Sequence, residues 1–205
     1  MPTILEAGSS PGRRCDVATY WDPGAPLSPL SINHFSIYAG DMSLFAEYVT
    51  LDSSQLRELR DSPAEEQFEL YDTLSETEGG EDIDKMWHAL HFALTGLPGT
   101  TPDRDNPLSF AVLGRDPFAE DDDESMVVVL AAEVGAALQA LEGVDPAAIR
   151  NRIDAESIYD GSIYGVDDYA DREFVFAELE NALSVVTRVY RKAAAEKRSV
   201  VFRLS

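Results

Sequence analysis

The segment from Ile83 to Gly96 predicts a helix with one broad apolar face. Asp82 or Asp84 can cap its start, because a short carboxylate accepts hydrogen bonds from the free N–H groups of a first turn. Gly96 provides a left-handed stop, and Pro98 blocks continuation of the helix. The apolar side chains repeat at helical spacing and are Ile83, Met86, Trp87, Leu90, Ala93 and Leu94.

A narrow polar stripe borders this apolar face. Asp84, His88 and His91 lie at positions i, i+4 and i+7 of the predicted helix, so their side chains can touch one another. In a functional interpretation they form a metal-binding face or a carboxylate-oriented acid–base pair, because imidazole changes charge near neutral pH. A metal ion would need a further ligand from elsewhere in the chain.

A structural interpretation of the same stripe is also open, and we favour it. The imidazole rings then lie at the edge of the core and bond to backbone carbonyls, while Asp84 caps the helix. The His-x-x-His spacing alone is a much weaker metal signal than His-Glu-x-x-His. We therefore predict no metal site and no cofactor.

Common catalytic motifs are absent from the sequence. The chain has no phosphate-binding loop, no dinucleotide fingerprint and no Gly-x-Ser-x-Gly elbow. The acidic segment 115–125 lacks the alternating pattern and central glycine of a calcium-binding loop. No catalytic residue is assigned, and the sequence leaves open whether the protein is an enzyme.

The chain is strongly acidic. Its 205 residues include 38 acidic and 16 basic side chains, which gives a formal net charge of -22. This charge argues against nucleic acid and against an anionic membrane surface, because both are bound through Lys and Arg. A basic protein partner would be attracted. Solubility alone is the simpler explanation, since dispersed acidic side chains keep a protein soluble without any partner.

Cysteine content and hydropathy indicate the expected compartment. Cys15 is the only cysteine, so no internal disulfide can form. No segment reaches the roughly 18 apolar residues of a membrane span, and no secretory signal is visible. We therefore expect a cytoplasmic protein.

The two parts of the chain differ in composition. Residues 1–41 are rich in Pro, Gly and Ser and predict an irregular N-terminal extension. Residues 42–205 predict one α+β domain, a small sheet of about four strands with helices packed against it. The expected strands are 44–50, 108–114, 126–130 and 199–204, with an acidic loop at 115–125. The expected helices, besides 83–96, are 55–60, one beginning at Pro63, 132–141, 146–153 and 173–197.

Several segments together resemble a known family. They run from Lys85 to Gly96, from Asn106 to Gly114 and through Ile158-Tyr159, followed by the final helix and strand. From about Met42 to the C-terminus the sequence is similar to the YfbM-like family (domain of unknown function 1877). The resemblance implies that family's compact fold and no reaction, so no catalytic residue is carried over. It suggests that Trp87, His88, His91, Asn106 and Gly114 belong to one structural or functional centre.

Two functions remain as hypotheses. The first is a protein-interaction module, for example an immunity-type inhibitor of a basic toxin. The alternative is a small enzyme or ligand-binding protein, whose cleft lies beside His88 and His91. Asp84 would then orient an imidazole, and Trp87 or Tyr159 would form an apolar wall. The sequence does not determine the oligomeric state, although the long C-terminal helix could supply an interface.

Overall fold

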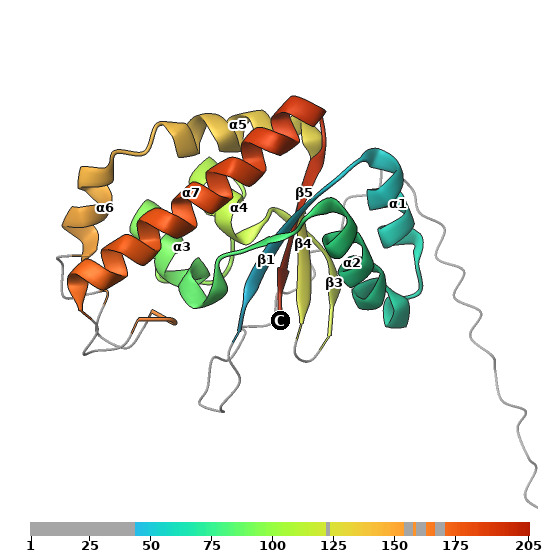
Figure 1. The fold of residues 1–205 in the computed structure, drawn as a ribbon, viewed down its shortest axis with the longest axis horizontal. Helices are drawn as coiled ribbons and strands as arrows, with labels where there is room; N and C mark the ends of the chain where they lie inside the picture. The colour runs from blue at the N-terminus through green and yellow to red at the C-terminus, as the bar shows by residue number, and fades with distance from the viewer. Residues whose placement is uncertain (1–43, 122–123, 154–157, 159–162, 167–170) are drawn as a thin grey trace, which may run out of the picture. The chain divides into compact units, whose positions relative to one another are not determined.

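A computed structural model describes residues 44–205 except 122–123, 154–157, 159–162 and 167–170 (Figure 1). The predicted extension 1–41 and Tyr159 therefore lie outside the described residues. The strands are β1 (Ala46–Leu51), β2 (Glu81–Asp82), β3 (Asp116–Glu120), β4 (Ser125–Val129) and β5 (Ser199–Leu204). The helices are α1 (Ser53–Asp61), α2 (Ala64–Glu78), the short 3-10 helix η1 (Asp84–Met86), α3 (Trp87–Thr95), α4 (Pro107–Leu113), α5 (Ala131–Glu142), α6 (Pro146–Ile153) and α7 (Arg172–Glu196).

The strands form one antiparallel sheet in the order β2-β1-β5-β4-β3. The last strand of the chain, β5, lies at its centre. It pairs with β1 from Leu204 opposite Ala46 to Ser199 opposite Leu51, and with β4 on its other side. The domain is therefore an α+β fold, as predicted, with five strands where about four were expected.

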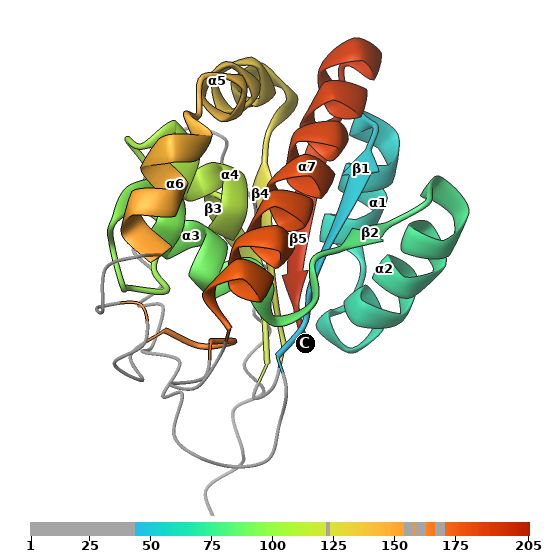
Figure 2. The ribbon, with the colours of Figure 1, turned by 60° about the vertical axis from the view of Figure 1, so that its left-hand side comes forward.

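Helices cover both faces of the sheet, as Figure 2 shows. Successive side chains of a strand point to opposite faces. Tyr48 and Phe202 accordingly join the large core beneath α3 to α7, whereas Val49 and Val201 join the smaller core beneath α1 and α2. Because both faces are buried, β4 reads as a continuous apolar run without a polar alternation.

Ion pairs at the cationic C-terminal end of α7 connect this part of the chain to three other elements. Arg188 binds Glu81 of β2 at 2.8 and 2.5 Å, and Arg191 binds Glu142 of α5 at 2.8 Å. Arg198, just after α7, pairs with Glu78 of α2. Ion pairs at an exposed surface contribute little each, about 0–1 kcal/mol. The positive charge that the sequence gathers at the end of α7 is thus mostly paired within the domain.

Two predicted elements were wrong. Segment 108–114, expected as a strand, is the helix α4, and the expected loop 115–125 contains β3. Asn106 is the N-cap of α4, with its side chain accepting from the Leu108 N–H at 3.1 Å, and Pro107 occupies the first turn. This cap-then-proline pair is a helix-start signal. Since the five consecutive residues Ser109 to Leu113 of α4 are all buried, its apolar run carries no helical period.

Candidate functional site

Three of the residues predicted to form a site, Trp87, His88 and His91, lie on α3 in the interior of the domain. Trp87 and His88 each expose 1% of their surface, and His91 exposes none. The helix packs against α4, α6 and α7, so it is apolar almost all round. A helix buried on all sides places its polar side chains among packed neighbours, and each must find a partner there.

His88 joins two separate segments through its ring. The Tyr164 backbone N–H donates to His88 Nδ1 at 3.0 Å, and Nε2 lies 2.8 Å from the Pro98 carbonyl oxygen. A carbonyl can only accept, so Nε2 carries the proton and Nδ1 is the acceptor. Burial lowers the pKa of His88, and the Pro98 carbonyl offsets part of this effect. The ring is therefore neutral at neutral pH.

Trp87 and Tyr164 complete the surroundings of His88. The Trp87 and His88 rings stack with their centroids 5.2 Å apart, and Tyr164 lies 5.9 Å from Trp87. Trp87 Nε1–H donates to the Leu44 carbonyl at 3.3 Å, while the Leu44 N–H donates to the Tyr164 hydroxyl at 2.7 Å. We call Trp87, His88 and Tyr164 the aromatic clamp. It satisfies both backbone groups of Leu44, just before β1.

Tyr164 is the clamp residue that the sequence did not single out. An aromatic wall was expected from Tyr159, which lies outside the described residues. Both tyrosines belong to the same aromatic, glycine-punctuated segment. Gly165 follows Tyr164 directly and has a φ of +85°, and a Cβ there would lie 2.4 Å from the Lys85 carbonyl oxygen. The close approach of Gly165 to Lys85 is visible only in the structure, so the sequence offered no more than the aromatic, glycine-punctuated composition of this segment.

His91 lies deeper and meets α4. Its Nε2 is 2.9 Å from the Ser109 hydroxyl, which also accepts from the Asp103 N–H at 2.8 Å. Burial, and then repulsion from His88, lower the pKa of His91 to about 4, with a partial offset from the Leu97 backbone. Among the described residues Nδ1 makes no hydrogen bond. Since Ser109 and His91 are both fully buried, this pair cannot meet a substrate without rearrangement.

Asp84 does not join the histidines, and the predicted stripe is interrupted. Asp84 is exposed, has a φ of +52° and, among the described residues, accepts only from the Lys85 N–H, at 2.8 Å. The expectation that it caps the helix was wrong, because α3 begins at Trp87 with Met86 as an N-cap that makes no side-chain hydrogen bond. It does not orient the His88 imidazole either, since Tyr164 and Pro98 occupy both ring nitrogens.

Asn106 contributes as a helix cap. We expect Asn106→Ala to lower the free energy of unfolding by about 1 kcal/mol, because the first turn of α4 loses its acceptor. Urea unfolding followed by circular dichroism measures this change. Asn106→Asp keeps a short acceptor and should stay close to the parent. Equal destabilisation by both substitutions would show that loss of the cap hydrogen bond does not cause the decrease in stability.

Two further features of the described region concern metals and membranes. Nowhere in that region do three side chains of His, Cys, Asp or Glu come together as a possible metal site. Its helices are all too short or too polar to cross a membrane.

The five-stranded sheet, with helices on both faces and a buried helix that carries two histidines, defines the class of protein as an α+β domain. The chain belongs to the family described as domain of unknown function (DUF1877), whose model matches residues 42–203. This confirms the resemblance that the sequence indicated.

A curated relative and a solved structure agree with this assignment. The chain is 28% identical over 158 residues to Protein YfbM of Escherichia coli (strain K12), covering 74% of this chain and 94% of that protein. The crystal structure of YfbM from Escherichia coli, a protein of unknown function, matches with a TM-score of 0.62 and 24% identity. That match covers 78% of this chain and 99% of the other and shows a shared fold.

Proposed function

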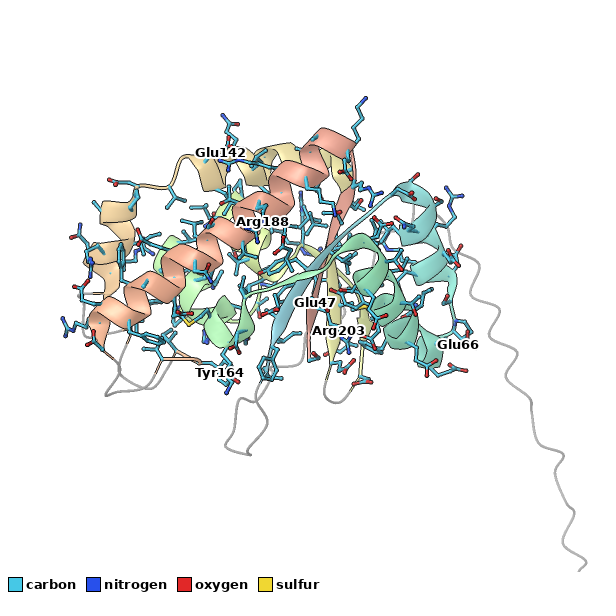
Figure 3. The ribbon with its side chains drawn as sticks, in the orientation of Figure 1. Glu47, Glu66, Glu142, Tyr164, Arg188 and Arg203 are labelled. Atoms are coloured by element: carbon cyan, nitrogen blue, oxygen red, sulfur yellow. The ribbon has the colours of Figure 1, made fainter. Side chains whose placement is uncertain are left out.

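We propose that this chain is a protein-binding module that recognises a basic protein through the outer face of α2. Four exposed carboxylates follow that face at intervals of four, three and four residues, which places them in one row along the helix. This acidic stripe consists of Glu65, Glu69, Asp72 and Glu76. Glu66, labelled in Figure 3, lies on the outer side of α2 and adds a further charge.

Little positive charge compensates the stripe. Between residues 52 and 84 the sequence has twelve acidic residues and two arginines, both on α1. Arg203 of β5 pairs with Asp72, whose side chain remains 60% exposed. Across the described part of the chain, Glu65, Glu69 and Glu76 form no ion pair.

This concentration of charge is the observation that carries the proposal. Like charges four residues apart on a helix destabilise it slightly, so the arrangement gives the isolated domain no benefit in stability. A basic partner would gain faster encounter and a fixed orientation from the complementary potential. An immunity-type inhibitor of a basic toxin is one concrete form of such a module. A purely solubilising surface is the competing explanation, and it requires no partner.

A comparison of charge variants tests the proposal. We expect Glu65→Gln, Glu69→Gln and Glu76→Gln together to abolish capture of partners that the parent chain retains from a lysate of its own cells. Asp72 is left intact because it binds Arg203. The matched control removes three charges elsewhere, with Glu120→Gln, Glu178→Gln and Glu180→Gln. Captured proteins are identified by mass spectrometry and then tested as purified partners.

Salt provides the second criterion. Raising the ionic strength from about 0.1 M to about 1 M shortens the Debye length from about 10 Å to about 3 Å, so capture by the stripe should disappear. Capture that survives high salt, or that both triple variants lose equally, contradicts recognition by the stripe. Absence of any retained protein would favour the solubility explanation.

The alternative centre around Asp84, His88 and His91 has less support. Both imidazoles are buried and hydrogen-bonded to other residues of the domain, while Asp84 is exposed and, within the described part of the chain, bonded only to Lys85. A ligand would have to displace the Tyr164 N–H or the Pro98 carbonyl to bind His88, and the Ser109 hydroxyl to bind His91 Nε2.

A further inference from the structure

The aromatic clamp contains a hydrogen bond that exists for only one protonation state of His88. Nδ1 accepts from the Tyr164 N–H, and Nε2–H donates to the Pro98 carbonyl. An imidazolium carries a proton on both nitrogens and can accept at neither. The Tyr164 N–H belongs to the backbone, so it cannot turn around to become an acceptor. Protonation therefore places two donors, the Tyr164 N–H and the new Nδ1–H, face to face with no acceptor between them.

His91 lacks this constraint, although it lies on the same helix. Its Nε2 faces the Ser109 hydroxyl, which can rotate and either donate or accept. A proton added to His91 would meet the cost of burial but no fixed donor at Nε2. The two histidines therefore differ in their hydrogen-bond partners. His88 Nδ1 faces a fixed backbone donor that is incompatible with a protonated ring, whereas His91 Nε2 faces a hydroxyl that is compatible with one.

We propose that His88 is a pH-sensitive latch, which holds residues 163–166 on α3 while its ring is neutral and releases them when it is protonated. Release would extend beyond one hydrogen bond. The Tyr164 hydroxyl also holds the Leu44 N–H, so the chain entering β1 loses an anchor. Ile163 and Val166 are buried on either side of Tyr164, so opening exposes apolar surface.

The charged groups that the structure describes near the latch have partners of their own. In η1, Asp84 accepts from the Lys85 N–H, and the Lys85 ammonium lies 5.7 Å from the Phe45 ring centre. Further charged groups on described elements packed against α3 include Arg152 of α6, bound to the Phe92 carbonyl, Asp103 before α4, bound to the Asp105 N–H, and Glu173 of α7, bound to Arg150. His91 is the titratable neighbour on α3 itself, and the two rings repel when charged. Among the described residues, no carboxylate is a main influence on the pKa of His88.

The experiment follows the Tyr164 amide by hydrogen exchange and the His88 ring by NMR, in the full chain, as pH is lowered from neutral. We expect protection of the Tyr164 amide to fall about tenfold per pH unit once His88 begins to charge, since one proton controls the opening. The Val201 amide, in the central strand, reports on the rest of the fold and should stay protected.

Two variants sharpen the result. His88→Asn puts a neutral oxygen near the position of Nδ1, so the Tyr164 amide should remain protected throughout the same pH range. His91→Gln keeps the latch and should keep its pH dependence. If the asparagine variant does not fold, hydrogen exchange of the Tyr164 and Val201 amides in the parent, together with titration of its His88 ring, still tests the latch.

Three outcomes would overturn the proposal. Tyr164 protection could stay constant while the His88 ring titrates. It could be lost over the same pH range in folded His88→Asn. It could also be lost at the same pH as Val201 protection, which would mean that the domain unfolds as a whole and has no separate latch.

Discussion

Gly114→Ala is expected to lower the free energy of unfolding by about 3–5 kcal/mol. Gly114 joins α4 to β3 with φ 73° and ψ 179°, a backbone region open almost only to glycine. A Cβ there would lie 2.5 Å from both Cβ and Cγ1 of Val127 in β4. Strain in the backbone and overpacking of the core therefore add together. Urea unfolding at neutral pH measures the loss.

Two comparisons separate the contributions of strain and overpacking. Gly79, after α2, has the same φ but a ψ of 70°, in the ordinary left-handed region, and a Cβ added there meets no atom within 4 Å, so Gly79→Ala should cost only about 1–2 kcal/mol. Val127→Ala removes Cγ1, one of the two atoms that the added methyl group would strike. The Gly114 substitution should then cost less in that background than in the parent, which a double-mutant cycle detects. If Gly114→Ala costs no more than Gly79→Ala, the close approach of Val127 has no energetic importance.

Three of the five strands were predictable because their compositions are distinctive. Residues 44–50, 126–130 and 199–204 are rich in β-branched and aromatic side chains, and all three segments contain strands. Residues 108–114 have a similar composition but form α4, because the Asn106-Pro107 start signal outweighs the composition of a short apolar run. The two-residue strand β2 depends on pairing with β1 and has no signal of its own.

The site was predictable only along α3. Helical spacing correctly put Trp87, His88 and His91 on one helix, but it could not show what the rings touch. Tyr164 bonds to His88 across 76 residues, and Ser109 meets His91 across 18. The prediction that Asp84 lies beside His88 failed for a local reason. Its positive φ and the 3-10 turn break the helical register that would have joined the two residues.

The structural interpretation of the histidines has a consequence for acid stability, and His91 should dominate it. Its pKa is about 4 in the folded chain and about 6.5 when exposed to water. Between these values the unfolded chain binds the proton and the folded chain does not. The stabilisation is complete above about pH 6.5 and is lost as pH falls towards about 4, by about 3 kcal/mol in all.

His91→Gln isolates this effect, because it removes the titrating ring while keeping a polar group for Ser109. The acidic surface is present in both proteins, so its contribution cancels in the comparison. Repulsion between His88 and His91 is removed together with the ring and counts as part of the His91 effect. Between about pH 6.5 and about pH 5 the parent should lose about 2 kcal/mol more free energy of unfolding than the variant. Urea unfolding at several pH values gives both curves. Parallel curves would mean that His91 takes up a proton as readily in the folded domain as in water, and its burial against α4 would then carry no electrostatic cost.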